Sequence, residues 1–423
     1  MKKLASRHKR VASNGVYLFI LTFSNYFLYL LTIPYQTRVL GPEVFGLVGF
    51  AMAFAAYFKI VIDFGFMISA TEQISIHRDN QTKVSKILSN VMHAKLWLTG
   101  AAALVLLLVC LFVPIFREHA LLFILFFIGS VAKSFMPDFV YRGIEKMRAI
   151  TIRSVVVQAF FLVFMLVLVK SPSDVLWIPA LDALGSIIAL IFVMRHVASH
   201  GFKISRSSAR EVLATIKEGM WFFYSRIAAN IYTATNIFVL GLVYGASSQV
   251  LGLYTAADRL VNAGKQAIIP VGDALYPHMV RRKDFRLMKY VLVVGVPIMA
   301  VGCAVVALFA HDICALIFGP EYYEAGDYLR ILTVAVFLAF PGVLLGFPTL
   351  SPMGLAKQAN ISNVIAAVLQ VVQIVVLLVT GNLTVINVCI ITCITEFVAV
   401  AYRVYVVMRH RGKLYSRDLF VRD

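Results

Sequence analysis

Charged side chains interrupt three strongly apolar segments of the sequence. Lys59 and Asp63 lie one predicted helical turn apart in the first segment, and Arg226 precedes Asn230 on one predicted face of the second. The third segment carries its polar residues at i, i+4 and i+7 and on a neighbouring face: Asp258, Asn262, Lys265, Arg259 and Gln266. An ionised side chain inside a bilayer costs several kcal/mol, so each of these positions is a candidate for function.

Basic residues outnumber acidic ones at these positions, which favours an anionic substrate. Arginine forks in particular match the oxygens of a phosphate group. The sequence predicts a substrate-binding cavity lined by Lys59, Arg226, Asn230, Arg259 and Lys265. Two acids, Asp63 and Asp258, would tune the charge of these bases or carry a coupling ion.

A structural interpretation stays open beside the functional one. Lys59 with Asp63, and Arg226 with Asp258, would neutralise each other in a dry helix interface. The basic surplus argues against this interpretation, because two acids cannot neutralise four bases.

Further charged residues lie in other apolar segments. Lys95 and Lys133 lie near predicted cytoplasmic helix ends, so we expect them to extend to the membrane surface as anchors. Asp182 and Glu396 are isolated in the sequence, and an interhelical hydrogen bond explains them as well as a function does.

The elements that position these residues must be membrane helices. Of 423 residues, 61% are hydrophobic and 14% are charged, and the mean hydropathy is +0.86. Soluble domains are about 45–50% apolar and about 25% charged, which excludes a soluble multidomain enzyme. Apolar segments of roughly 20 residues predict an all-α membrane protein with about 12 spans. We place these spans at 14–36, 46–69, 91–114, 119–138, 151–170, 175–195, 217–243, 250–275, 288–310, 328–350, 360–380 and 384–408.

Loop charge predicts the orientation and the division of the chain. Alternate loops carry nearly all the basic residues, so the positive-inside rule places both termini in the cytoplasm. This bias accounts for most of the net charge of +18 without a nucleic-acid partner. The longest predicted cytoplasmic connection, 196–217, separates two six-helix bundles, 1–200 and 201–423, as in transporters built from repeats.

Signatures of catalysis are missing from the sequence. Gly264-Lys265 and Gly412-Lys413 lack the other residues of a phosphate-binding loop. No metalloprotease, zinc-ribbon or serine-hydrolase motif occurs, and the five cysteines have no metal-ligand or disulfide spacing. We therefore predict no catalytic residues, no metal site, no cofactor and no enzymatic activity.

The stretch 34–80 carries a family resemblance. Thr37-Arg38, Leu40-Gly41-Pro42-Glu43, Phe45-Gly46, Asp63-Phe64-Gly65 and Arg78-Asp79-Asn80 closely resemble the bacterial polysaccharide flippases. These are O-antigen, or Wzx-type, transporters of the multidrug/oligosaccharidyl-lipid/polysaccharide exporter superfamily.

The resemblance implies an architecture and a function. Two bundles would form a V-shaped cavity lined by helices one, two, seven and eight. The substrate would be an oligosaccharide repeat unit on undecaprenyl diphosphate, moved from the inner to the outer leaflet of the bacterial inner membrane. Proton or sodium coupling and contact with a polymerase and other polysaccharide-assembly proteins would accompany this function.

Two alternatives remain at the level of the sequence. A multidrug antiporter of the same superfamily would favour an acidic cavity, which the basic surplus opposes. A membrane polysaccharide polymerase would need a sizeable outer loop, and the predicted outer loops are short.

Overall fold

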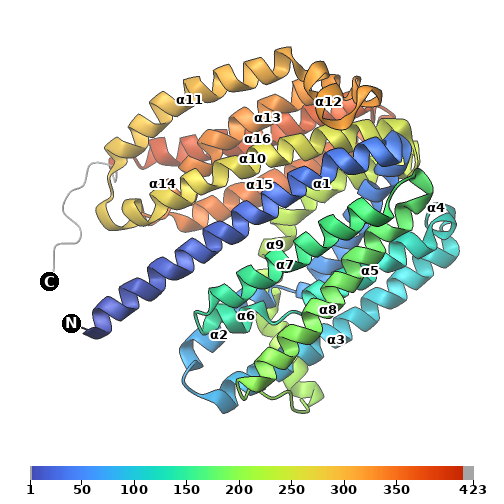
Figure 1. The fold of residues 1–423 in the computed structure, drawn as a ribbon. Helices are drawn as coiled ribbons and strands as arrows, with labels where there is room; N and C mark the ends of the chain where they lie inside the picture. The colour runs from blue at the N-terminus through green and yellow to red at the C-terminus, as the bar shows by residue number, and fades with distance from the viewer. Residues whose placement is uncertain (1, 413–423) are drawn as a thin grey trace. The chain divides into compact units, whose positions relative to one another are not determined.

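The structure is a computed structural model that describes the backbone of residues 2–412, while the side chains of residues 2–30, 225, 226 and 228–233 lie outside the described set. Every regular element in the described backbone is a helix, as Figure 1 shows, and no strand occurs there. The prediction of an all-α membrane protein is confirmed.

The first part of the chain forms eight α-helices and one short 3-10 helix. They are α1 (Lys2–Asp63), α2 (Phe66–His77), α3 (Gln81–Phe112), α4 (Pro114–Glu118), α5 (Ala120–Ser134), α6 (Asp138–Gly143), α7 (Met147–Leu168), η1 (Pro172–Leu176) and α8 (Trp177–Ser199). The second part comprises α9 (Ala209–Tyr244), α10 (Gln249–Arg282), α11 (Phe285–Leu308), α12 (Ala310–Phe318), η2 (Pro320–Tyr322), α13 (Ala325–Leu345), α14 (Phe347–Leu350), α15 (Ala356–Val379) and α16 (Val385–Arg409).

The predicted spans fall in helical parts of the chain, although the first two share α1 and the second continues into α2. Among the described residues, nine helical stretches are long and apolar enough to cross a membrane, beginning with Leu31–His77. The other three predicted spans, 14–36, 217–243 and 250–275, fall in the first part of α1, in α9 and in α10. Predicted spans one and two meet near Gly41, where the backbone of α1 leaves helical geometry (φ 72°, ψ 171°).

Contacts group the described chain into two units. Unit 1 comprises α1 to α8, α9 as far as Asn230, and the segment Gly241–Ser247, whereas unit 2 comprises Ile231–Leu240 and α10 to α16. The predicted boundary at residue 200 precedes α9, and the grouping by contacts adds the first part of α9 to unit 1. The units are described separately below.

Each unit has an apolar interior of its own. In unit 1, α2, α3 and α6 meet through side chains that are fully buried, among them Phe66, Leu88 and Phe139. In unit 2, α13 packs against α10, α11 and α16, with Met279 and Leu344 fully buried. Close packing of this kind is the main attraction between membrane helices, because lipid is as apolar as the helices themselves.

Candidate functional site

Unit 1 contains a buried ion pair that joins α1 to α3. The side chain of Lys95 is 2% exposed, and its Nζ lies 3.5 Å from Oδ1 of Asp63. The same ammonium group donates to the carbonyl oxygen of Ser134 and lies 5.6 Å from the ring centroid of Phe139. The prediction of Lys95 as a surface anchor is therefore wrong.

A break between α1 and α2 holds Asp63 in this position. Asp63 is the last residue of α1, and Phe64 (φ 40°) and Gly65 (φ 78°) follow it with left-handed backbone. A Cβ on Gly65 would lie 2.7 Å from Cβ of Phe222, so both the backbone angle and the space require glycine. Phe64 in turn stacks on Phe223 of α9, with ring centroids 4.2 Å apart.

The predicted partner of Asp63 lies elsewhere. Lys59 is exposed on α1, one turn before Asp63, and the described ion pair of Asp63 is made with Lys95 instead. Lys59 is thus exposed rather than paired with Asp63 as the sequence suggested.

Two of the other acid–base pairs in unit 1 involve α7 and α8. Arg153 of α7 donates from both terminal nitrogens to the carboxylate of Asp138, with the Nη2 to Oδ2 distance at 3.0 Å. Lys133 of α5 lies 2.6 Å and 2.7 Å from the two carboxylate oxygens of Asp182 on α8. Asp182 is therefore not isolated, and it fastens α8 to α5 through Lys133.

In unit 2 the predicted polar stripe on α10 is present. The Asn262 side chain donates to Oδ2 of Asp258 at 2.8 Å, one turn away on the same helix. Nζ of Lys265 lies 2.6 Å from Oε1 of Glu396 on α16, with these side chains 21% and 15% exposed. Glu396 is thus not isolated either. Arg259 is half-buried beside this stripe.

Two of the predicted site residues cannot be placed in this way. The side chains of Arg226 and Asn230 lie outside the described residues, although both positions belong to α9.

A neutral polar network, not predicted from the sequence, crosses the interior of unit 2. The side-chain amide of Asn236 donates to the hydroxyls of Tyr254 at 3.0 Å and Thr392 at 2.9 Å, and its oxygen accepts from Gln370 at 2.8 Å. Thr395 extends the chain by donating to Gln370 Oε1 at 2.6 Å. A sequence signal was present, since Gln370 lies within the apolar segment 360–380, and Thr392 and Thr395 lie within 384–408.

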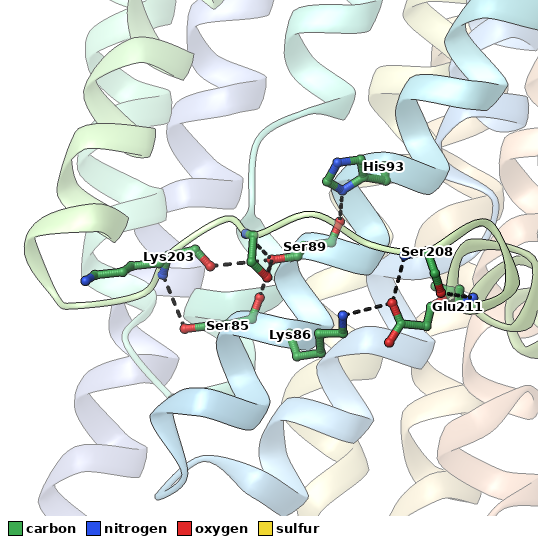
Figure 2. A network of polar contacts seen from close by, with 9 residues as sticks. Ser85, Lys86, Ser89, His93, Lys203, Ser208 and Glu211 are labelled. Atoms are coloured by element: carbon green, nitrogen blue, oxygen red, sulfur yellow. Dashed lines mark hydrogen bonds and ion pairs between the residues drawn. The ribbon is translucent and has the colours of Figure 1, made fainter.

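The connection between α8 and α9 is fastened to α3, as Figure 2 shows. Oγ of Ser85 accepts from the amide of Lys203 at 3.2 Å, and Oγ of Ser89 accepts from the amide of Ser205 at 2.9 Å. These bonds hold the connection, residues 201–208, along α3 rather than leaving it as a free loop.

The first turn of α9 completes this attachment (Figure 2). Ser208 and Glu211 form a capping box, and Nζ of Lys86 on α3 lies 2.8 Å from Oε2 of Glu211. The hydrogen bonds from Lys86 and from the Ser208 amide lower the pKa of the Glu211 carboxyl, because both favour its charged form.

Comparison with known proteins identifies the family. The sequence profile of the family described as "Polysaccharide biosynthesis protein" matches residues 11–283, which is more than half of the chain. The chain belongs to this family. The predicted resemblance is thereby confirmed at the level of the family.

The chain is also similar to curated proteins and to solved structures. It is 28% identical over 333 residues to a protein assigned as an O-antigen transporter in Escherichia coli K12, covering 77% of this chain and 80% of the relative. Its fold is similar to that of the lipid II flippase MurJ in an inward closed conformation (TM-score 0.70, 12% identity, 95% and 90% of the two chains covered). It is also similar to an inward-facing multidrug resistance transporter of the MATE family and the MOP superfamily (TM-score 0.65, 15% identity, 93% and 96% covered). At these identities the solved neighbours show the fold alone.

Proposed function

We propose that this protein is a flippase for lipid-linked oligosaccharides. It would move repeat units carried on undecaprenyl diphosphate from the inner to the outer leaflet of the bacterial inner membrane, for assembly of an O-antigen-like surface polysaccharide. The observation that carries this proposal is membership of the polysaccharide biosynthesis family, together with the similarity of 77% of the chain to an assigned O-antigen transporter. A polymerase and other assembly proteins would take up the delivered repeat units.

The substrate diphosphate would bind to the basic side chains predicted from the sequence. Lys59 on α1, Arg226 and Asn230 on α9, and Arg259 and Lys265 on α10 supply the positive charge and hydrogen-bond donors. Phosphate oxygens accept charge-assisted hydrogen bonds from such groups, and arginine does so with two parallel bonds. The lipid tail would stay in the bilayer while the diphosphate and the sugars cross.

Lys265 would change partner during transport. Its ammonium group is already bonded to Glu396 at 2.6 Å, so a substrate phosphate must displace that carboxylate. An exchange of one anion for another leaves the lysine charge compensated in both states. Binding and release would therefore each cost less than with an uncompensated lysine.

The two predicted tuning acids have different surroundings. Asp63 is bonded to buried Lys95, and Asp258 accepts from Asn262 beside Arg259 and Lys265. Protonation of either carboxylate, or binding of sodium to it, would weaken its attraction for the neighbouring basic side chain. Loss of the ion would restore that attraction. An ion gradient could drive alternating access through this change of charge at the carboxylates.

The test is the leaflet that the lipid-linked repeat units occupy in cells without the gene. Units trapped on the cytoplasmic face, and inaccessible to an enzyme added outside, are the expected result. Complementation with Arg259→Glu should fail to restore export, while Arg281→Glu, at the exposed cytoplasmic end of the same helix, should restore it.

Two outcomes would contradict the flippase function, and two more would contradict the roles given to individual residues. Units that reach the outer face but stay single would indicate a polymerase, and unchanged polysaccharide would direct the next test to multidrug transport. Normal export by Arg259→Glu would remove that residue from the binding site. The coupling role fails if Asp63→Asn and Asp258→Asn both leave the export rate and its pH dependence unchanged.

A further inference from the structure

Two histidines form an exposed pair at the end of α8. His196 lies in the last turn of α8, and His200, four residues later, is the residue that caps the helix at its C-terminal end. Both side chains are exposed, and their ring centroids are 4.5 Å apart. Two imidazoles at i and i+4 on one helix face are the arrangement that holds a zinc ion in metalloprotease helices.

Both rings of this pair use Nδ1 for the hydrogen bonds that they make among the described residues. Nδ1 of His200 lies 2.9 Å from the carbonyl oxygen of His196. A carbonyl only accepts, so Nδ1 carries the proton and Nε2 of neutral His200 carries the lone pair. Nδ1 of His196 lies 2.7 Å from the hydroxyl of Tyr141 on α6, which can donate to this nitrogen or accept from it; in the tautomer that donates from Nδ1, Nε2 carries the lone pair. Among the described residues, neither Nε2 takes part in a hydrogen bond or ion pair.

This arrangement supplies what a metal-binding histidine needs. Ligating histidines generally donate their second ring nitrogen to an oxygen, which fixes the tautomer and the ring orientation. The last turn of a helix also carries partial negative charge from its carbonyl groups, which attracts a cation. His93 of α3 makes the same type of Nδ1 bond, to the carbonyl of Ser89 at 2.8 Å, but no second histidine lies four residues away on its face.

We propose that His196 and His200 form a binding site for a divalent transition-metal ion such as Zn²⁺. Nε2 of each ring would be a ligand, and water would complete the coordination. Imidazole nitrogen suits zinc, copper and nickel, whereas magnesium and calcium prefer oxygen ligands. This site is separate from the cavity of the proposed flippase and does not depend on that function.

A metal ion bound at this position would restrain the end of α8 and the start of the connection to α9. The carbonyl of His200 accepts from the side chain of Gln81 at 2.8 Å, just before the connection to α9 begins. A metal ion held by both rings would fix the last turn of α8, and with it the start of this connection.

Zinc binding to the purified full chain tests the proposal. The protein is isolated with a tag that contains no histidine, stripped with a chelator, and titrated with Zn²⁺ in competition with a chromophoric chelator. We expect one saturable site per chain, with affinity reduced at least about tenfold in His196→Asn and in His200→Asn. His93→Asn is the matched control and should keep the wild-type affinity.

A second measurement separates ligation from loss of fold. Cu²⁺ bound to the wild-type chain should give an electron paramagnetic resonance spectrum with coupling to imidazole nitrogen, and this coupling should disappear in the double variant. The double variant should elute as a single species of wild-type size, since both side chains are exposed. A wild-type chain without a saturable site, or a double variant that binds Zn²⁺ as wild type does, would overturn the proposal.

Discussion

The two units place polar groups in their interiors in different ways. Unit 1 uses formal charges, with Lys95 against Asp63 and Arg153 against Asp138. Unit 2 also has an ion pair, Lys265 with Glu396, but the amides and hydroxyls around its buried Asn236 exchange neutral hydrogen bonds. A buried charge depends on one partner of opposite sign, whereas an amide both donates and accepts and can share several partners. Loss of one side chain should therefore harm unit 1 more than unit 2.

The largest effect is expected at the buried lysine of unit 1. Lys95→Met removes the partner of Asp63 and should lower the free energy of unfolding by about 3 kcal/mol, because the carboxylate is left uncompensated. Denaturant unfolding of the protein in detergent micelles measures this change. The exposed Lys83→Met on the same helix is the control and should change stability by less than about 0.5 kcal/mol.

A double variant sharpens this prediction. Asp63→Asn combined with Lys95→Met removes both charges and should recover part of the stability lost in Lys95→Met. A Lys95→Met variant as stable as wild type would show that the pair contributes little to stability. The claim that unit 1 is the more sensitive unit would then fail.

A smaller effect is expected in the neutral network. Gln370→Leu leaves the oxygen of Asn236 and the hydroxyl of Thr395 without this partner, at a cost of about 1–3 kcal/mol. Gln373→Leu is a milder control, because Gln373 only accepts a bond of 3.0 Å from Thr395. Thermal unfolding of both variants measures the difference. A greater loss in Gln370→Leu than in Lys95→Met would reverse the comparison.

The smallest effect is expected at the exposed pair that fastens α9 to α3. The pKa of Glu211 is lowered in the folded state, so this contact stabilises fully above the ordinary pKa of a glutamate. The stabilisation is lost as the pH falls through the lowered pKa. Glu211→Gln should therefore reduce stability slightly at neutral pH and reduce it less in acid. A variant with an unchanged difference from wild type across this pH range would contradict the assignment.

The positions of the helices could be predicted from the sequence, because they depend on residue patterns within each segment. Runs of apolar residues predicted each span, and the polar residues of 217–243 and 250–275 marked α9 and α10. The polar stripe on α10 was also predictable, since Asp258 and Asn262 are one turn apart and bond to each other.

Partners between helices could not be predicted in the same way. Asp63 has a lysine one turn away in the sequence, yet it pairs with Lys95, 32 residues further on. Asn236 and Gln370 are 134 residues apart. Periodicity shows which face of a helix is polar, but only the packing of the helices decides which polar face it meets.

The attachment of the connection between α8 and α9 has a consequence for proteolysis. Lys203 and Arg206 make this connection a trypsin substrate by sequence, and a free surface loop would be cut there early. A protease must draw an extended backbone segment into its active site, and here the amides of Lys203 and Ser205 are held by Ser85 and Ser89. Cleavage requires the connection to detach first, so the cleavage rate measures how often the segment of residues 201–208 leaves α3.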